Sequence, residues 1–206
     1  MITVRYKKPY NESYPVVCMD ESPKQLIEEG RKTLPMKSGS EKREDYEYIR
    51  HGVVNIFMVN EPLVGRRLVE VTNTKTKKDW AVFLKKIADE MYLDAEKITL
   101  AINNFKTHSP FSLYEAFTPG EAKRILDRFE FIFTPKHGSW LNMAEIELHV
   151  LNGQCLNRHI ATIDKVKTEV EAWQKSRNSK NAKINWQFTK EDAWIKLKRL
   201  YPTIHT

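Results

Sequence analysis

The order of its apolar runs limits this chain to a small set of folds. Three β-type runs come first, and then helical and β-type patterns alternate up to about residue 151. Turn residues at 60–65 join the second and third runs, so the first three strands should form an antiparallel meander. The order βββ-α-β-α-β-α indicates an α/β protein with one mixed five-stranded sheet flanked by helices. Strands are expected at 15–20, 53–59, 67–72, 98–102 and 129–133.

Helix signals lie between and after the later strands. Thr76 and Asp79 form a capping-box pattern at the start of the first helix. Thr118, followed directly by proline, marks a second start. A third helix is expected over 140–151, after the fifth strand.

The chain has the length of one domain, and 206 residues suffice for a sizeable core. We expect a single domain over 1–206. Pro23 is expected to end the first strand, because proline cannot join the hydrogen-bonded ladder. Residues 24–50 are mostly polar, and we expect them to form a mobile loop on the surface of this domain.

The net charge of +7 favours a polyanionic partner, and double-stranded DNA is the first candidate. Cys18 and Cys155 lie outside any C-x-x-C pair, so neither a disulfide framework nor a zinc site is expected. No stretch approaches the roughly 18 apolar residues that span a bilayer. We therefore expect a cytoplasmic protein without a membrane partner.

Polar residues follow two of the predicted strands and occupy one helix. Asp20 ends the first strand, Asn103 follows the fourth, and Glu145 lies on the helix after the fifth. Neighbouring strand ends of a mixed sheet place such residues side by side, and three oxygen ligands suit Mg²⁺. Two such ions, about 3.5–4 Å apart, would stabilise both oxygens of a phosphodiester displacement. Taken singly, an acidic residue at the end of a strand is more often a solvated surface group than a metal ligand.

Three motifs resemble a known family. Residues 102–110, INNFKTHSP, resemble the D-N-x-x-x-H segment of the mariner-like transposases, and the bacterial insertion-sequence 630 family matches best. Residues 135–147, PKHGSWLNMAEIE, resemble that family's third block, where the Glu after L-N-x-x completes an acidic triad. Residues 17–21, VCMDE, match the first block. The resemblance covers nearly the whole chain, from residue 15 to residue 201, and its third block is the most specific part.

The resemblance implies the catalytic domain of a DDE transposase with an RNase H-like fold. Asp20, Asn103 and Glu145 would be its triad and its metal ligands, with Mg²⁺ or Mn²⁺ as the metal and two ions in an intact site. Such domains cleave DNA at transposon ends and transfer the resulting 3′-hydroxyl, generally as homodimers. The implied location is the nucleoid of a bacterial or archaeal cell. The usual N-terminal helix-turn-helix region is expected to be absent from this chain.

The sequence departs from the family pattern at Asn103, where an aspartate is expected. An amide oxygen can contact a metal but brings no charge, so we expect a protein that folds but cleaves DNA poorly. A catalytically dead DNA-binding protein with the same fold is the main alternative, and Asn103 favours it. An RNase H-like nuclease of another kind, such as a junction resolvase, is disfavoured by residues 135–147.

Further residues are expected to support the triad or to contact DNA. Asn142 lies three positions before Glu145, on nearly the same helical face, and should orient it. Arg66 and Arg67 lie in a hairpin and either reach DNA or are solvated. The residues expected around the triad are Glu21, Asn104, His108, Lys136, His137, Ser139, Trp140 and Asn142.

Overall fold

The computed structural model describes residues 9–30, 38, 47–103, 109–135, 138–187, 189, 191–192 and 195. Asn104, His108, Lys136 and His137, which we expected near the site, lie outside these ranges. The strands are β1 (Val16–Glu29), β2 (Tyr48–Glu61), β3 (Arg66–Thr72), β4 (Ile98–Ile102) and β5 (Phe129–Phe133). The α-helices are α2 (Lys77–Lys86), α3 (Leu113–Ala116), α4 (Pro119–Asp127), α5 (Met143–Leu151) and α6 (Ile163–Ser179). Short 3₁₀ or π segments are η1 (Ile87–Met91), η2 (Pro110–Ser112), η3 (Ser139–Leu141) and η4 (Asn152–Leu156).

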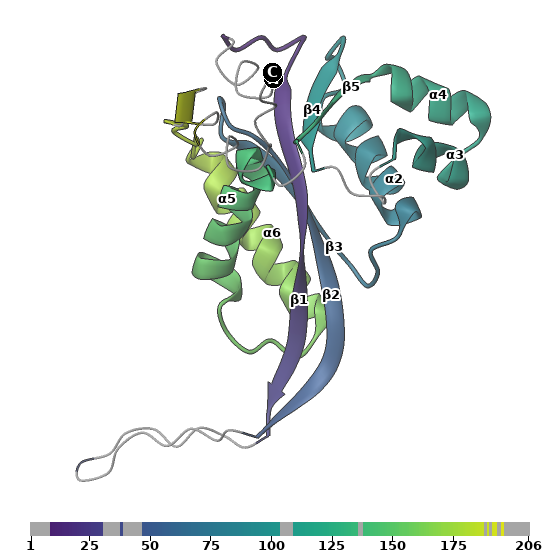
Figure 1. Ribbon diagram of the computed structural model, residues 1–206. Helices are drawn as coiled ribbons and strands as arrows, with labels where there is room; N and C mark the ends of the chain where they lie inside the picture. The colour runs from purple at the N-terminus through teal and green to yellow at the C-terminus, as the bar shows by residue number, and fades with distance from the viewer. Residues whose placement is uncertain are drawn as a thin grey trace, which may run out of the picture.

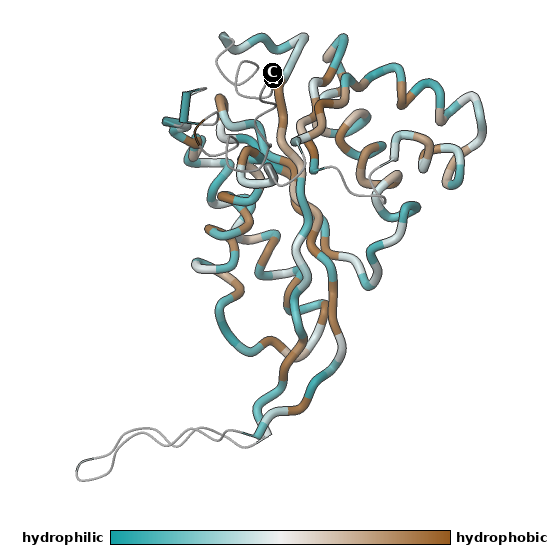
Figure 2. The backbone as a smooth tube through the Cα atoms, in the orientation of Figure 1, coloured by the Kyte–Doolittle hydropathy of each residue, from teal (hydrophilic) through white to brown (hydrophobic). Residues whose placement is uncertain are grey.

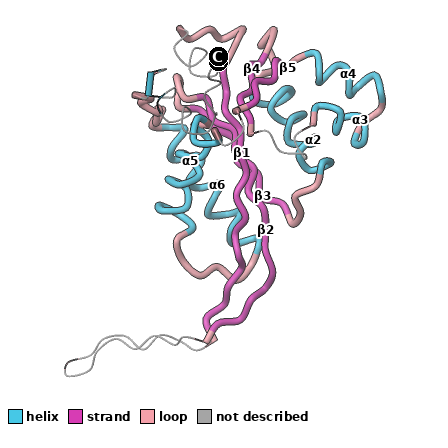
Figure 3. Tube along the Cα trace, in the orientation of Figure 1, coloured by secondary structure: helices cyan, strands magenta, loops and turns pink. Residues whose placement is uncertain are grey.

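One five-stranded sheet, in the order β3-β2-β1-β4-β5, forms the centre of the molecule (Figure 3). β1 and β2 pair antiparallel, as do β2 and β3, whereas β4 is parallel to both β1 and β5. The predicted antiparallel meander and the mixed five-stranded sheet are therefore confirmed.

Helices cover both faces of the sheet (Figure 1). The β-pleat sends Val17 and Met19 into the larger core, under α2, α3 and α4. Cys18 points to the opposite face, where it packs with the start of α5. In Figure 2 the hydrophobic stretches run along the central strands, between these two helical layers. None of the helices in the described ranges is long and apolar enough to cross a membrane.

The first strand is longer than predicted. Pro23 lies inside β1, opposite Asn55, and β1 continues to Glu29. The expected break at Pro23 is therefore wrong, and so is the expected loop at 24–29 and 48–50, which belongs to β1 and β2. The reason is that β4 pairs with β1 only as far as Cys18. Beyond that point no strand of the described residues pairs with this edge of β1, so a proline there removes no ladder hydrogen bond.

The free edge of β3 is covered by two side chains of α6. The Asn178 side chain accepts a hydrogen bond from the Arg67 amide at 3.0 Å and donates one to the Arg67 carbonyl at 2.9 Å. The Gln174 side chain accepts from the Val69 amide at 2.6 Å. These amides replace a neighbouring strand, so the edge is closed to pairing with another chain.

Four charged side chains join α2 and η1 to α4. Arg124 binds both carboxylate oxygens of Asp89, at 3.0 and 2.9 Å, and binds Glu121 at 2.7 Å. Lys85 also contacts both acids. The hydrogen bond from Arg124 and then that from Lys85 lower the pKa of Glu121 to about 2. The Arg124 guanidinium likewise lowers the pKa of Asp89.

We expect this network to make stability depend on acid pH. A carboxyl whose pKa is lower in the folded state stabilises the fold above its unfolded pKa, and this contribution is lost as the pH falls through the folded pKa. The urea midpoint of the wild type should therefore fall towards that of Glu121→Gln between about pH 5 and pH 2. A midpoint difference that stays constant over this range would contradict the assignment.

Candidate functional site

The register of the parallel strands brings two predicted site residues together. The paired part of β1 and β4 ends with Cys18 opposite Ala101. Two residues further along the same register, Asp20 lies beside Asn103. The Asn103 amide nitrogen, Nδ2, donates a hydrogen bond to Asp20 Oδ2 at 3.0 Å. Both side chains are buried, at 6% and 4% exposed.

A third polar side chain, Thr134, lies beside Asn103 at the end of β5. We call Asp20, Asn103 and Thr134 the row. Ile102 is opposite Phe133, so Thr134 follows β5 at the level of Asn103. The Thr134 hydroxyl donates to Asn103 Oδ1 at 3.2 Å, and Thr134 is buried. Each of the three residues of the row lies two positions beyond a residue that packs on the α5 side of the sheet. Side chains two positions apart on a strand point to the same face, so the row lies on one face of the sheet edge. Thr134 was not predicted from the sequence, because only the register of β4 and β5 brings it beside Asn103.

Asn142 joins this row to the start of α5. Its Nδ2 donates to the carbonyl oxygen of Met19 at 2.8 Å and lies 3.4 Å from Asn103 Oδ1. Its Oδ1 accepts from the amide of Ala144 at 3.1 Å, so the same side chain is the N-cap of α5. One buried amide thus fixes the helix to β1 and β4 together.

Glu145 lies in the first turn of α5, one turn after Asn142. Residues three apart lie on the same face of a helix, so the Glu145 side chain is attached to the face of α5 that is turned towards the row. It is half-buried, and its carboxylate makes no hydrogen bond or ion pair with any residue in the described part of the chain. Among the described residues, Asp20 and Asn103 are joined directly, and Asn142 connects them to the turn of α5 that bears Glu145.

Residue 103 presents a nitrogen, not an oxygen, to Asp20. The orientation is set by its neighbours, since Thr134 and Asn142 donate to Oδ1 while Asp20 accepts from Nδ2. If the Asn103 amide were rotated by half a turn, its oxygen would face the Asp20 carboxylate and its N–H₂ group would face the N–H₂ group of Asn142. The network of hydrogen bonds therefore selects the observed orientation.

These residues do not fit a two-ion centre. Two divalent cations carry four positive charges, and the row with Glu145 offers two carboxylates and one amide. The amide turns its N–H₂ group towards Asp20, where a cation would need an oxygen. Within the ranges that the structure describes, no group of three or more His, Cys, Asp and Glu side chains could hold a metal ion.

The remaining predicted residues take varied positions. The Glu21 side chain is 2% exposed and pairs with Lys75 at 2.5 Å, so only its backbone amide contacts Asp20, at 2.9 Å. Ser139 is exposed in η3, and Trp140 is half-buried beside it.

Arg67 corrects one of our expectations. It is 3% exposed, and its Nε lies 3.0 Å from the Glu147 carboxylate, so it does not reach DNA from a solvated hairpin. Arg177 contacts the same carboxylate at 2.7 Å. Glu147 is two residues beyond Glu145 on α5, on nearly the opposite side of the helix. Its role in holding α5 was not anticipated, because its partners come from β3 and α6.

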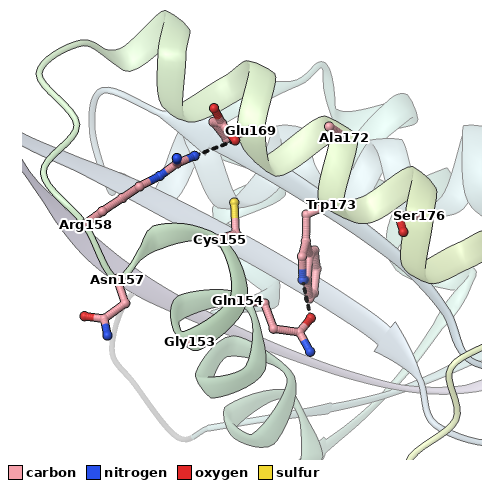
Figure 4. A pocket seen from close by; sticks show the side chains of 9 residues that line it. All are labelled: Gly153, Gln154, Cys155, Asn157, Arg158, Glu169, Ala172, Trp173 and Ser176. Atoms are coloured by element: carbon pink, nitrogen blue, oxygen red, sulfur yellow. Dashed lines mark hydrogen bonds and ion pairs between the residues drawn. The ribbon is translucent and has the colours of Figure 1, made fainter.

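A hollow of about 470 Å³ lies between η4 and α6, away from this row (Figure 4). Four of the side chains that line it bind one another in pairs. Arg158 pairs with Glu169 at 2.6 Å, and the Trp173 indole donates to Gln154 at 2.9 Å. None of the predicted site residues lines it.

Comparisons with known proteins agree with the mixed sheet and its flanking helices. The model of the DDE superfamily endonuclease family matches residues 15–167. The solved Mos1 mariner paired end complex with Mn has a TM-score of 0.58 and 13% identity, covering 87% of this chain and 53% of that chain. The Mos1 transposase paired-end complex with left transposon end gives 0.58 and 13%, covering 97% and 55%. The Mos1 strand transfer complex gives 0.57 and 13%, again covering 97% and 55%. No curated protein sequence matches.

The chain thus spans just over half the length of these Mos1 chains. At this identity the likeness shows the fold, an RNase H-like α/β sheet flanked by helices. The family match covers most of the chain, and it includes Asp20, Asn103 and Glu145. The chain belongs to the DDE superfamily endonuclease family.

Proposed function

We propose that this chain is the catalytic domain of a cut-and-paste DNA transposase of the mariner-like superfamily, in its insertion-sequence 630 branch. Its reaction would be phosphodiester cleavage at transposon ends, followed by strand transfer. The observation that carries the proposal is the contact between Asp20 and residue 103, at the sheet edge where Asn142 anchors the helix that bears Glu145. The motif at residues 135–147 supports the same branch.

The proposed partners are double-stranded DNA and a second copy of the chain. The similar Mos1 structures are a paired end complex with Mn, a complex with the left transposon end and a strand transfer complex, which supports DNA and a divalent metal by analogy. We propose Mg²⁺, or Mn²⁺, for a site in which all three positions are carboxylates. Bound there, such ions would stabilise the charge on the phosphodiester oxygens.

We further propose that cleavage by this sequence is weak. Asn103 removes one of three carboxylates, and its N–H₂ group faces Asp20. The same hydrogen bond favours a second candidate function, DNA binding without hydrolysis, because it stabilises Asp20 without any metal.

Asn103→Asp separates these two functions. With Mg²⁺ or Mn²⁺ and labelled duplex DNA, we expect nicking to rise by at least about 100-fold, since even an outer partner of a metal ligand is worth about 10–100-fold. The gain should vanish in Asn103→Asp with Asp20→Ala. If Asn103→Asp changes nothing while salt-sensitive duplex binding persists, the chain is a binding module.

A further inference from the structure

We propose that Asn142 is a positioning residue that makes position 103 selective for a carboxylate. This inference rests on the proposed function, because it concerns the same metal site. It explains why an amide at 103 is a poor ligand although its carbonyl oxygen could contact a cation. The selection is made by the direction in which Asn142 presents its own amide.

The orientation of Asn142 is fixed by two backbone groups. Its Nδ2 faces the Met19 carbonyl oxygen, and its Oδ1 faces the Ala144 amide. Turning the side chain over would set oxygen against oxygen and N–H against N–H. The residue is fully buried, at 0% exposed, so water cannot relieve such contacts. Asn142 therefore always offers residue 103 a donor.

The other neighbours of residue 103 do not enforce a direction in the same way. The Thr134 hydroxyl can donate or accept, so it serves either orientation of the amide. Asp20 accepts a hydrogen bond from the Asn103 nitrogen, and it does so only while its own oxygens are not bound to a cation. Once a cation binds Asp20, Asn142 still donates to the Asn103 oxygen and holds it away from the cation.

A carboxylate at position 103 meets no such conflict. It has two oxygens, so one accepts from Asn142 while the other faces the cation. Asn142 then orients the ligand and strengthens binding. The same donor thus opposes an amide ligand and supports a carboxylate ligand, and this difference in sign is the property to test.

Asn142→Ser is the test variant, because serine keeps a side-chain oxygen suited to the N-cap and loses the amide donor. Mn²⁺ binding is measured without DNA, by calorimetry and by electron paramagnetic resonance of the free ion. With Asn103 in place we expect Asn142→Ser to tighten Mn²⁺ binding about fivefold, the worth of roughly one hydrogen bond. In the Asn103→Asp background we expect it to weaken binding about fivefold.

Thr134→Val is the matched control and should change Mn²⁺ affinity in the same direction in both backgrounds. Asn142→Thr, which also retains a cap oxygen, replaces the serine variant if that variant unfolds, as judged by its urea midpoint. A purely structural role for Asn142 predicts weaker binding in both backgrounds, and that result would overturn the inference. An Asn103→Asp protein that binds no Mn²⁺ at all would instead refute the metal centre of the proposed function.

Discussion

Replacing Glu147 with alanine is expected to lower the free energy of unfolding by about 3–5 kcal/mol, because it leaves a buried charge unpaired. The Glu147 side chain is 1% exposed and contacts two arginines, Arg67 at 3.0 Å and Arg177 at 2.7 Å. Arg177 is 20% exposed and can turn to water, whereas the Arg67 side chain, at 1%, cannot. The loss should therefore fall mainly on Arg67.

The electrostatics of Arg67 support this expectation. Burial lowers the pKa of its guanidinium, and the Glu147 carboxylate acts in the opposite direction. Without Glu147, the remaining contacts of Arg67 are neutral acceptors, the side chain of Asn178 and the carbonyl of Ala182. Neutral acceptors solvate a guanidinium less well than a carboxylate does.

Urea unfolding measures the effect. Glu171→Ala is the matched control, because Glu171 forms an exposed pair with Lys175 on α6 and its loss should leave the urea midpoint almost unchanged. If Glu147→Ala and Glu171→Ala shift the midpoint equally, the buried ion pair does not hold α5 in place.

The burial of Glu147 could not be predicted from the sequence. The pattern of α5 identified Glu145 through its motif, and nothing local distinguished Glu147 as buried. Its partners come from β3 and α6, so its burial follows from tertiary packing. Arg67 was misassigned for the same reason, since a basic residue in a hairpin is usually solvated.

The strand ends were predictable because apolar runs stop there. Asp20 and Asn103 each follow such a run, and the structure joins them. Thr134 was missed, because its place in the row depends on the register of β4 and β5. The path of β1 through Pro23 was also missed, because it depends on where β4 stops pairing. Local patterns thus predicted Asp20 and Asn103, whereas the position of Thr134 and the path of β1 depend on the register between segments that are distant in the sequence.

The second large effect is expected from Asn103→Asp in the absence of metal. The present contact is a hydrogen bond from an amide to a carboxylate, 3.0 Å long and buried. The substitution turns it into a contact between two carboxylates. A hydrogen bond to a charged group is worth about 1.5–3 kcal/mol, and adjacent like charges add to its loss. We expect the free energy of unfolding to fall by about 3 kcal/mol.

A divalent cation should reverse this loss. A ligand that binds only the folded state adds about 2.7 kcal/mol at 100 times its dissociation constant, which nearly equals the expected cost. Thermal unfolding of Asn103→Asp should therefore shift upwards with millimolar Mn²⁺, while the unsubstituted chain and Asn103→Asp with Asp20→Ala should barely respond. If the unsubstituted chain gains as much from Mn²⁺ as the variant, Asn103 is already a metal ligand. The hydrogen bond to Asp20 would then be no substitute for a cation.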